Sequence, residues 1–219
     1  MTIKSRERVK KHGEVFTPDF VVEDMIHLVK NETERIESRF LEPACGDGNF
    51  LVEVLKRKLD IVKRKYRKSQ YDFEKNSIIV IGSIYGVELL EDNRTVALDR
   101  LYAFFRNEYE NLYKKNSNND FLKNIQFVLS RNILQGDAVT LKNDENKLIV
   151  FSEWSLVGGS KIKRRDFQFV DLADFVHEDK TQNLFSVEEI SDTGEIMYSP
   201  MPYKEYAPVN FTELYKTYE

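Results

Sequence analysis

The amino-acid sequence predicts an α/β fold built on a parallel sheet, because strand-like and helix-like segments alternate along the chain. Short runs rich in β-branched residues are typical of buried strands, and longer segments with apolar residues at helical spacing follow them. Strands that are joined through helices of this length form parallel sheets with right-handed crossovers. No internal repeat or low-complexity tract interrupts the series.

Length and composition limit the domain organisation. The chain has 219 residues, of which 41% are hydrophobic and 12% aromatic, and this is enough for one substantial core with appendages. We expect the core over residues 1–150 and a completing segment with an extended tail over residues 151–219. The single cysteine excludes an internal disulfide framework. Because no apolar stretch follows the basic N-terminus, we expect a cytoplasmic protein without a membrane partner.

Charge is segregated along the chain, although the net charge is only -4. Residues 56–68 (KRKLDIVKRKYRK) and 161–165 (KIKRR) are basic, whereas the last forty residues or so lean acidic. The run at 161–165 is either a phosphate-contacting loop or a solvated basic loop. Nucleic acid is therefore allowed as a partner, but the overall charge does not require it.

A first helix is predicted over residues 18–30. Thr17 is the expected N-cap and Pro18 the first helical position, and apolar residues then recur at helical spacing. Phe16 and Val21 occupy the N′ and N4 positions of a hydrophobic staple, which is a purely structural role for Phe16.

The next segments predict strand, glycine-rich turn and helix in succession. RFLEP (39–43) is a short strand, ACGDG the turn, and a long amphipathic helix begins near Asn49. A second long helix is expected over residues 91–113. Further strand-like runs are SIIVI (77–81), SIYGVELL (83–90), NIQFVLS (124–130) and KLIVFSEWS (147–155).

Candidate ligand-binding residues follow three of these strands. In open α/β sheets ligands bind at the carboxyl ends of the strands, where Gly46 and Gly48, Glu88 and Asp137 are expected. Each of these residues also has a purely structural explanation. Tight turns favour glycine, and Glu88 and Asp137 are explained equally well as solvated carboxylates at a strand end or a helix cap. Taken jointly and in this order, they favour a ligand.

The charges around the turn indicate which ligand. A loop that cradles a pyrophosphate uses backbone N–H groups and avoids anions, yet Glu42 and Asp47 flank this turn. A cofactor that carries an ammonium and a sulfonium would find these carboxylates favourable, and S-adenosylmethionine (SAM) fits. Glu88 is then expected to accept both ribose hydroxyls, and Asp137 the adenine amino group. The three histidines lack metal-site spacing, so no metal is predicted.

Four segments together resemble a known family. GEVFTP (13–18), LEPACGDGNFL (41–51), IYGVELLEDN (84–93) and NILQGDAV (132–139) resemble the consecutive SAM-binding motifs of the N6-adenine DNA methyltransferases, with the methionine-side segment first. The resemblance implies a three-layer Rossmann-like methyltransferase fold with a shortened C-terminal half. It also implies that SAM is bound by Phe16, Thr17, Glu42, Pro43, Ala44, Gly46, Gly48, Glu88 and Asp137.

The sequence departs from the family at the catalytic motif. The family carries Asn or Asp, two prolines and an aromatic residue after the fourth strand, where this chain has Ser-Glu-Trp-Ser, and neither Asn-Pro-Pro nor Asp-Pro-Pro occurs in the 219 residues. That tetrapeptide accepts the hydrogens of the target amine and stacks on the flipped base. Glu153 and Trp154 are the candidate catalytic replacements. Alternatively, they are a solvated carboxylate and a core aromatic.

Two functions therefore stay open from sequence. The first is a DNA adenine-N6 methyltransferase of a restriction-modification type, with sequence recognition supplied by another chain. The second is a catalytically reduced SAM-binding subunit with a regulatory or interaction role. A methyltransferase acting on another substrate is a third possibility, and sequence alone does not decide whether the chain is an enzyme.

Overall fold

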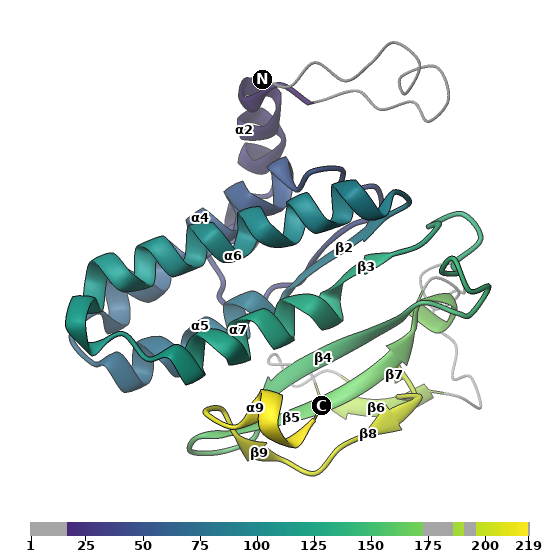
Figure 1. The fold of residues 1–219 in the computed structure, drawn as a ribbon. Coiled ribbons are helices and arrows are strands. Elements are labelled where there is room, and N and C mark those ends of the chain that lie inside the picture. The colour runs from purple at the N-terminus through teal and green to yellow at the C-terminus, as the bar shows by residue number, and fades with distance from the viewer. Residues whose placement is uncertain (1–16, 173–185, 191–195, 219) are drawn as a thin grey trace.

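A three-stranded parallel sheet lies at the centre of the computed structural model, which describes residues 17–172, 186–190 and 196–218 (Figure 1). Its strands are β1 (Phe40–Glu42), β2 (Ile84–Glu88) and β3 (Ile133–Gln135), in the order β1-β2-β3. Glu42 is in register with Gly86, and Glu88 with Gln135, so the carboxyl ends of all three strands meet at one edge. The predicted mixed α/β fold with a parallel sheet is confirmed.

Each crossover between neighbouring strands contains two long helices. The first consists of α4 (Asn49–Tyr66) and α5 (Gln70–Gly82), and the second of α6 (Glu91–Tyr113), the short 3-10 helix η1 (Lys114–Asn116) and α7 (Asn119–Asn132). Figure 1 shows α4 beside α6 and α5 beside α7. The predicted β1, the predicted start of α4 and both predicted bounds of α6 are confirmed.

Two predicted strands are wrong, because they belong to helices. SIIVI forms the last part of α5, which starts behind Ser69, whose hydroxyl accepts a hydrogen bond from the Asp72 N–H. NIQFVLS lies within α7, where the Asn118 side chain caps the first turn. The apolar side chains of both runs are largely buried in the main core, and this packing outweighs the strand preference of β-branched residues.

The first helix begins later than predicted. In α2 (Asp19–Leu28) Pro18 takes the N-cap position with extended backbone angles, and its carbonyl accepts the N–H groups of Val21 and Val22. Thr17 is therefore not the cap. A short α3 (Lys30–Thr33) follows. The predicted staple position of Phe16 lies outside the described residues.

A second, antiparallel sheet follows the parallel one. It is a hairpin of β4 (Val150–Leu156) and β5 (Lys161–Gln168), to which β8 (Lys204–Glu205) and β9 (Val209–Asn210) add on β5. A separate pair is formed by β6 (Ser186–Ile190) and β7 (Ile196–Pro200). KLIVFSEWS therefore does not supply a fourth parallel strand, since its pairing partner is the antiparallel β5.

The basic run KIKRR forms most of β5 rather than a loop. The Lys163 ammonium lies 2.9 Å from a Glu205 carboxylate oxygen, and Arg165 Nε lies 2.6 Å from Glu153. Arg164 is buried and binds Asp166 through two guanidinium nitrogens at 2.8 Å. Because these charges are paired within the protein, the alternative of a phosphate-contacting loop loses its support.

The hairpin covers one face of the parallel sheet. Tyr85 and Val87 of β2 form a small apolar cluster with Ile149, Phe151 and Phe169, and the Tyr85 and Phe151 rings meet edge to face at 5.4 Å. Residue Gly86 faces the opposite way, since a Cβ there would lie 2.9 Å from Leu51 of α4. β2 is therefore enclosed between helix α4 and the hairpin.

A buried lysine fixes α4 to the amino ends of the strands. The Lys58 ammonium donates to the carbonyls of Ile36 and Ser38 and to the Ser83 hydroxyl, and it lies 5.2 Å from the centre of the Phe40 ring. Burial lowers the pKa of Lys58 to about 7. These bonds leave the carboxyl edge of the sheet free for a binding site.

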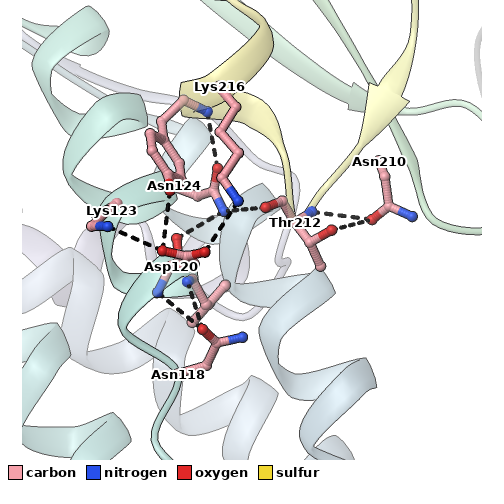
Figure 2. A network of polar contacts seen from close by, with 9 residues as sticks. Asn118, Asp120, Lys123, Asn124, Asn210, Thr212 and Lys216 are labelled. Atoms are coloured by element: carbon pink, nitrogen blue, oxygen red, sulfur yellow. Dashed lines mark hydrogen bonds and ion pairs between the residues drawn. The ribbon is translucent and has the colours of Figure 1, made fainter.

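A polar network attaches the C-terminal tail to α7 (Figure 2). The fully buried Asn124 donates to the Thr212 carbonyl and accepts from the Tyr215 N–H, both at 3.0 Å. Asp120 accepts from Lys123, Lys216 and Tyr215, and these contacts lower the pKa of its carboxyl to about 2. Helix α9 (Leu214–Thr217) is held on α7 in this way.

Replacing Asn124 with alanine should loosen this attachment. We expect Asn124→Ala to lower the free energy of unfolding by about 1 to 3 kcal/mol, because two backbone groups of the tail lose their partner. Urea denaturation measures the change. Lys216→Ala, which removes an exposed ion pair with Asp120 and a cation–π contact with Tyr215, should shift the urea midpoint much less, and equal midpoints in the two variants would contradict the role given to Asn124.

Candidate cofactor site

A cavity of about 670 Å³ lies at the carboxyl edge of the parallel sheet. Its walls come from the start of α2, the turn after β1, the end of β2 with the start of α6, and the loop after β3. Seven of the predicted cofactor-binding residues line it: Thr17, Glu42, Pro43, Ala44, Gly46, Glu88 and Asp137. Gly48 does not line the cavity, and Phe16 lies outside the described residues.

The two glycines of the turn have different roles. Gly46 (φ 54°) and Gly48 (φ 82°) both adopt the left-handed backbone conformation that favours glycine. Gly48 is the N-cap of α4, and a Cβ there would lie 3.1 Å from the Ala97 Cβ of α6. Gly48 therefore permits close packing of α6 against the turn, whereas Gly46 contributes to the cavity wall.

The Glu88 carboxylate connects three parts of the wall. One oxygen accepts the Gly46 N–H at 2.9 Å, and the other accepts the Leu90 N–H at 3.0 Å and the Asn93 side-chain amide at 3.3 Å. Glu88 is buried, with 7% of its surface exposed. Since a carboxylate has about four lone-pair directions, one remains available to a ligand.

Glu42 carries an oxygen without a partner. Its Oε2 atom is buried and makes no hydrogen bond within the described part of the chain. Burial, together with the negative charges of Asp47 and Glu88, raises the pKa of Glu42 to about 8. A buried polar atom without a partner is costly, so a cationic or hydrogen-bond-donating ligand would stabilise this oxygen.

The other two carboxylates are already in contact with the protein. The Asp47 carboxylate lies 2.9 Å from Arg100 Nη1, and Arg100 also binds the Asn49 side chain at 2.6 Å. Asp47 therefore adds less negative charge to the cavity than its sequence position indicates. One Asp137 oxygen accepts the Val139 N–H at 2.8 Å, which orders the loop after β3.

The cavity is acidic as a whole. Glu42, Asp47, Glu88 and Asp137 line it, and none of its described lining residues is a lysine, arginine or histidine. Burial raises the pKa of the Cys45 thiol, and the negative charges of Glu42, Glu88 and Asp47 raise it further. A cationic ligand is favoured in such surroundings, whereas a pyrophosphate would meet carboxylates in place of positive charge.

The N-terminal segment reaches the cavity as the sequence indicates. The Asn49 side-chain amide lies 3.4 Å from the Thr17 carbonyl, and Val22 and Met25 of α2 complete this wall. Sequence reasoning missed Asn49, Asn93 and Arg100. Asn93 had a detectable signal, since it closes the motif IYGVELLEDN, but the contact between Arg100 and the turn depends on helix packing alone.

The two candidate catalytic residues do not reach the cavity. Trp154 is 5% exposed and its ring packs edge to face against Phe127 at 6.0 Å. Glu153 is 6% exposed and accepts hydrogen bonds from Arg39 and Arg165. The catalytic roles predicted for Glu153 and Trp154 stay untested. The placement of Trp154 favours the alternative of a core aromatic, whereas the alternative of a solvated carboxylate is wrong for Glu153, which is buried and paired with two arginines.

Comparison with known proteins identifies the family of this chain. A family model described as N-6 DNA Methylase matches residues 2–194, so the chain belongs to this family. A candidate type II restriction enzyme and methyltransferase from Methanocaldococcus jannaschii is 29% identical over 93 residues, which is 41% of this chain. The chain spans about 8% of that relative's length. No solved structure matches significantly.

None of the described helices combines the length and apolar character needed to cross a bilayer. Within the same residues, no group of three or more His, Cys, Asp or Glu side chains is arranged to hold a metal ion.

Glu88→Gln tests the structural role of this carboxylate. The amide presents only one accepting oxygen to donors that now bind two, so we expect the free energy of unfolding to fall by about 1 to 3 kcal/mol. Chemical denaturation of the purified chain provides the measurement. Glu91→Gln alters a half-exposed residue at the start of α6 and should cost less than about 0.5 kcal/mol. A similar loss in both variants would argue against the bonds assigned to Glu88.

Proposed function

We propose that this member of the N-6 DNA methylase family binds SAM in the acidic cavity. The observation that carries the proposal is the buried oxygen of Glu42 that has no hydrogen-bond partner. Glu42 is one of four acidic residues that line the cavity, and none of the described lining residues is basic. SAM carries the two positive centres that such a site would stabilise. We further propose that the described sheet belongs to a three-layer Rossmann-like methyltransferase fold, which the helical crossovers between its parallel strands support.

In this proposal, different residues of the cavity contact different parts of the cofactor. Glu88 has one acceptor direction left, so it would hold one of the two ribose hydroxyls, and Asp137 would hold the adenine amino group. Glu42 would face a positive centre, while Thr17 would lie near the methionine end. When bound, SAM supplies a methyl group activated by its sulfonium. The chain's own contribution is to orient the cofactor by groups that the protein has already fixed in place.

We include DNA as the substrate in this proposal, because the chain belongs to the N-6 DNA methylase family. The Methanocaldococcus jannaschii relative, which is named as a restriction enzyme and methyltransferase, also supports it. Sequence recognition by another chain remains part of the same proposal. A second candidate, a SAM-binding subunit with reduced catalysis, is favoured by the buried positions of Glu153 and Trp154. A radiolabelled methyl-transfer assay on mixed DNA, with and without neighbouring gene products, distinguishes the two.

The ligand preference of the cavity can be tested by thermal unfolding. SAM and its demethylated product S-adenosylhomocysteine should raise the melting temperature, since a ligand that binds only the folded state stabilises it. NAD and ATP at the same concentration should produce no shift, because their phosphates would lie among carboxylates. A larger shift with NAD than with SAM would reverse the assignment of the cofactor.

The raised pKa of Glu42 predicts a coupling between cofactor binding and pH. The carboxyl is mostly protonated at pH 7 in the free protein, and a cationic cofactor favours its ionised form. SAM binding should therefore release a proton, and affinity should rise between about pH 6 and pH 7.5, below the titration of the cofactor's own α-ammonium. Calorimetry at pH 7 in buffers of different ionisation enthalpy measures the released proton.

Glu42→Gln is the matched variant for this measurement. It keeps the size of the side chain and removes its titration, so the proton release and the associated rise in affinity should both disappear. Equal proton release by the two proteins would show that another group is responsible.

A further inference from the structure

A second cavity, of about 530 Å³, lies along the other half of α4. Residues of this half line it from Arg57 to Arg67, and α3 and Leu112 of α6 provide the remaining walls. With a rise of about 1.5 Å per residue, this stretch lies roughly 12 to 27 Å along the helix axis from Asn49 at the acidic cavity. The two cavities are therefore separate sites on one helix.

The charge of this second cavity is opposite to that of the first. Five basic side chains and two acidic ones line it, the basic ones being Lys30, Arg57, Lys63, Arg64 and Arg67. Three of these are paired: Lys30 with Glu34, Arg57 with Glu53, and Lys63 with Asp60 and Glu108.

Arg64 and Arg67 are different from the other three. Both are exposed, and neither guanidinium makes a hydrogen bond or ion pair within the described ranges 17–172, 186–190 and 196–218. Arg64 lies in the last turn of α4 and Arg67 is its C-cap, still in helical backbone conformation, so their spacing of three residues places both side chains on the same face. The cavity therefore presents two unpaired guanidinium groups beside each other.

We infer that this basic cavity binds the phosphodiester backbone of DNA. A guanidinium offers a planar fork of N–H donors that matches two oxygens of one phosphate, and two neighbouring forks match two phosphates. DNA is the polyanion favoured here because the chain belongs to a DNA methylase family. The inference uses that membership and does not depend on SAM binding at the acidic cavity.

A purely structural role for these arginines makes a different prediction. Basic residues in the last turn of a helix stabilise its negative C-terminal end wherever they lie on its circumference. Phosphate binding instead requires the side chains that line the cavity. Lys65 and Lys68 belong to the same basic run and are exposed, but they do not line the cavity, so they provide a matched control.

The experiment measures the affinity of the full chain for a fluorescently labelled DNA duplex at several salt concentrations. The slope of log affinity against log salt changes by about 0.9 for each phosphate contact. The double variant R64Q/R67Q should lose about 1.8 from this slope and bind at least about tenfold more weakly at low salt. K65Q/K68Q, with the same net charge, should change the slope by less than about 0.5.

Several results would overturn the inference. Equal slopes for the two double variants would show a general effect of charge, and a lower melting temperature with an unchanged slope would show a helix-stabilising role only. If R64Q/R67Q lost binding to anionic phosphatidylglycerol vesicles but bound DNA as the wild-type chain does, the cavity would be assigned to a lipid surface.

Two additional measurements keep the test independent of folding and of the proposed function. The R64K/R67K variant retains both charges and should retain the slope while binding DNA several-fold more weakly, because the forks are lost. The thermal shift with SAM should be the same in the wild-type chain and in R64Q/R67Q. Absence of that shift in both proteins would reject the cofactor proposal and leave the DNA result unaffected.

Discussion

The carboxylate of Glu88 is the constraint on which the acidic cavity depends. It is buried at the end of β2 and holds the glycine turn after β1 through Gly46, and the entry to α6 through Leu90 and Asn93. One side chain thus fixes the entry to α6 and the glycine turn, which lies 42 residues earlier in the chain. Because the same group also lines the cavity, a ligand that reaches it would bind to a wall that is already ordered, and little conformational entropy would be lost there.

Helix α4 relates the two cavities electrostatically. Its N-terminus, which carries the partial positive charge of the helix dipole, lies beside the acidic cavity, and its C-terminal half lines the basic one. Each end of the helix is therefore next to side chains of the opposite sign. The net charge of -4 conceals this separation, which is a property of position along one helix and not of composition.

The local signals in the sequence predicted much of the fold, namely the parallel strands β1 and β2, the glycine turn and the long helices that follow them. The same kind of signal exists for α5 and α7, because their caps Ser69 and Asn118 precede the runs predicted as strands. Gly158 and Gly159, between β4 and β5, likewise mark a hairpin turn. The roles expected of Glu153 and Trp154 came from position within a family pattern, and the antiparallel pairing of β4 places both side chains elsewhere. The contact of Arg100 with Asp47 depends on how α6 packs, which no local pattern contains.

The docking of the tail on α7 and the hairpin has a consequence for the order in which this protein folds. Thr212 binds Asn124, which is 88 residues earlier in the chain, and the Tyr218 carbonyl accepts a bond from the buried Arg164. A ribosome completes α7 and the hairpin well before it makes these partners, because synthesis proceeds from the N-terminus. The outer face of the hairpin and the flank of α7 are consequently open on the nascent chain, and they are the surfaces that a chaperone would meet until residues 206–218 have emerged.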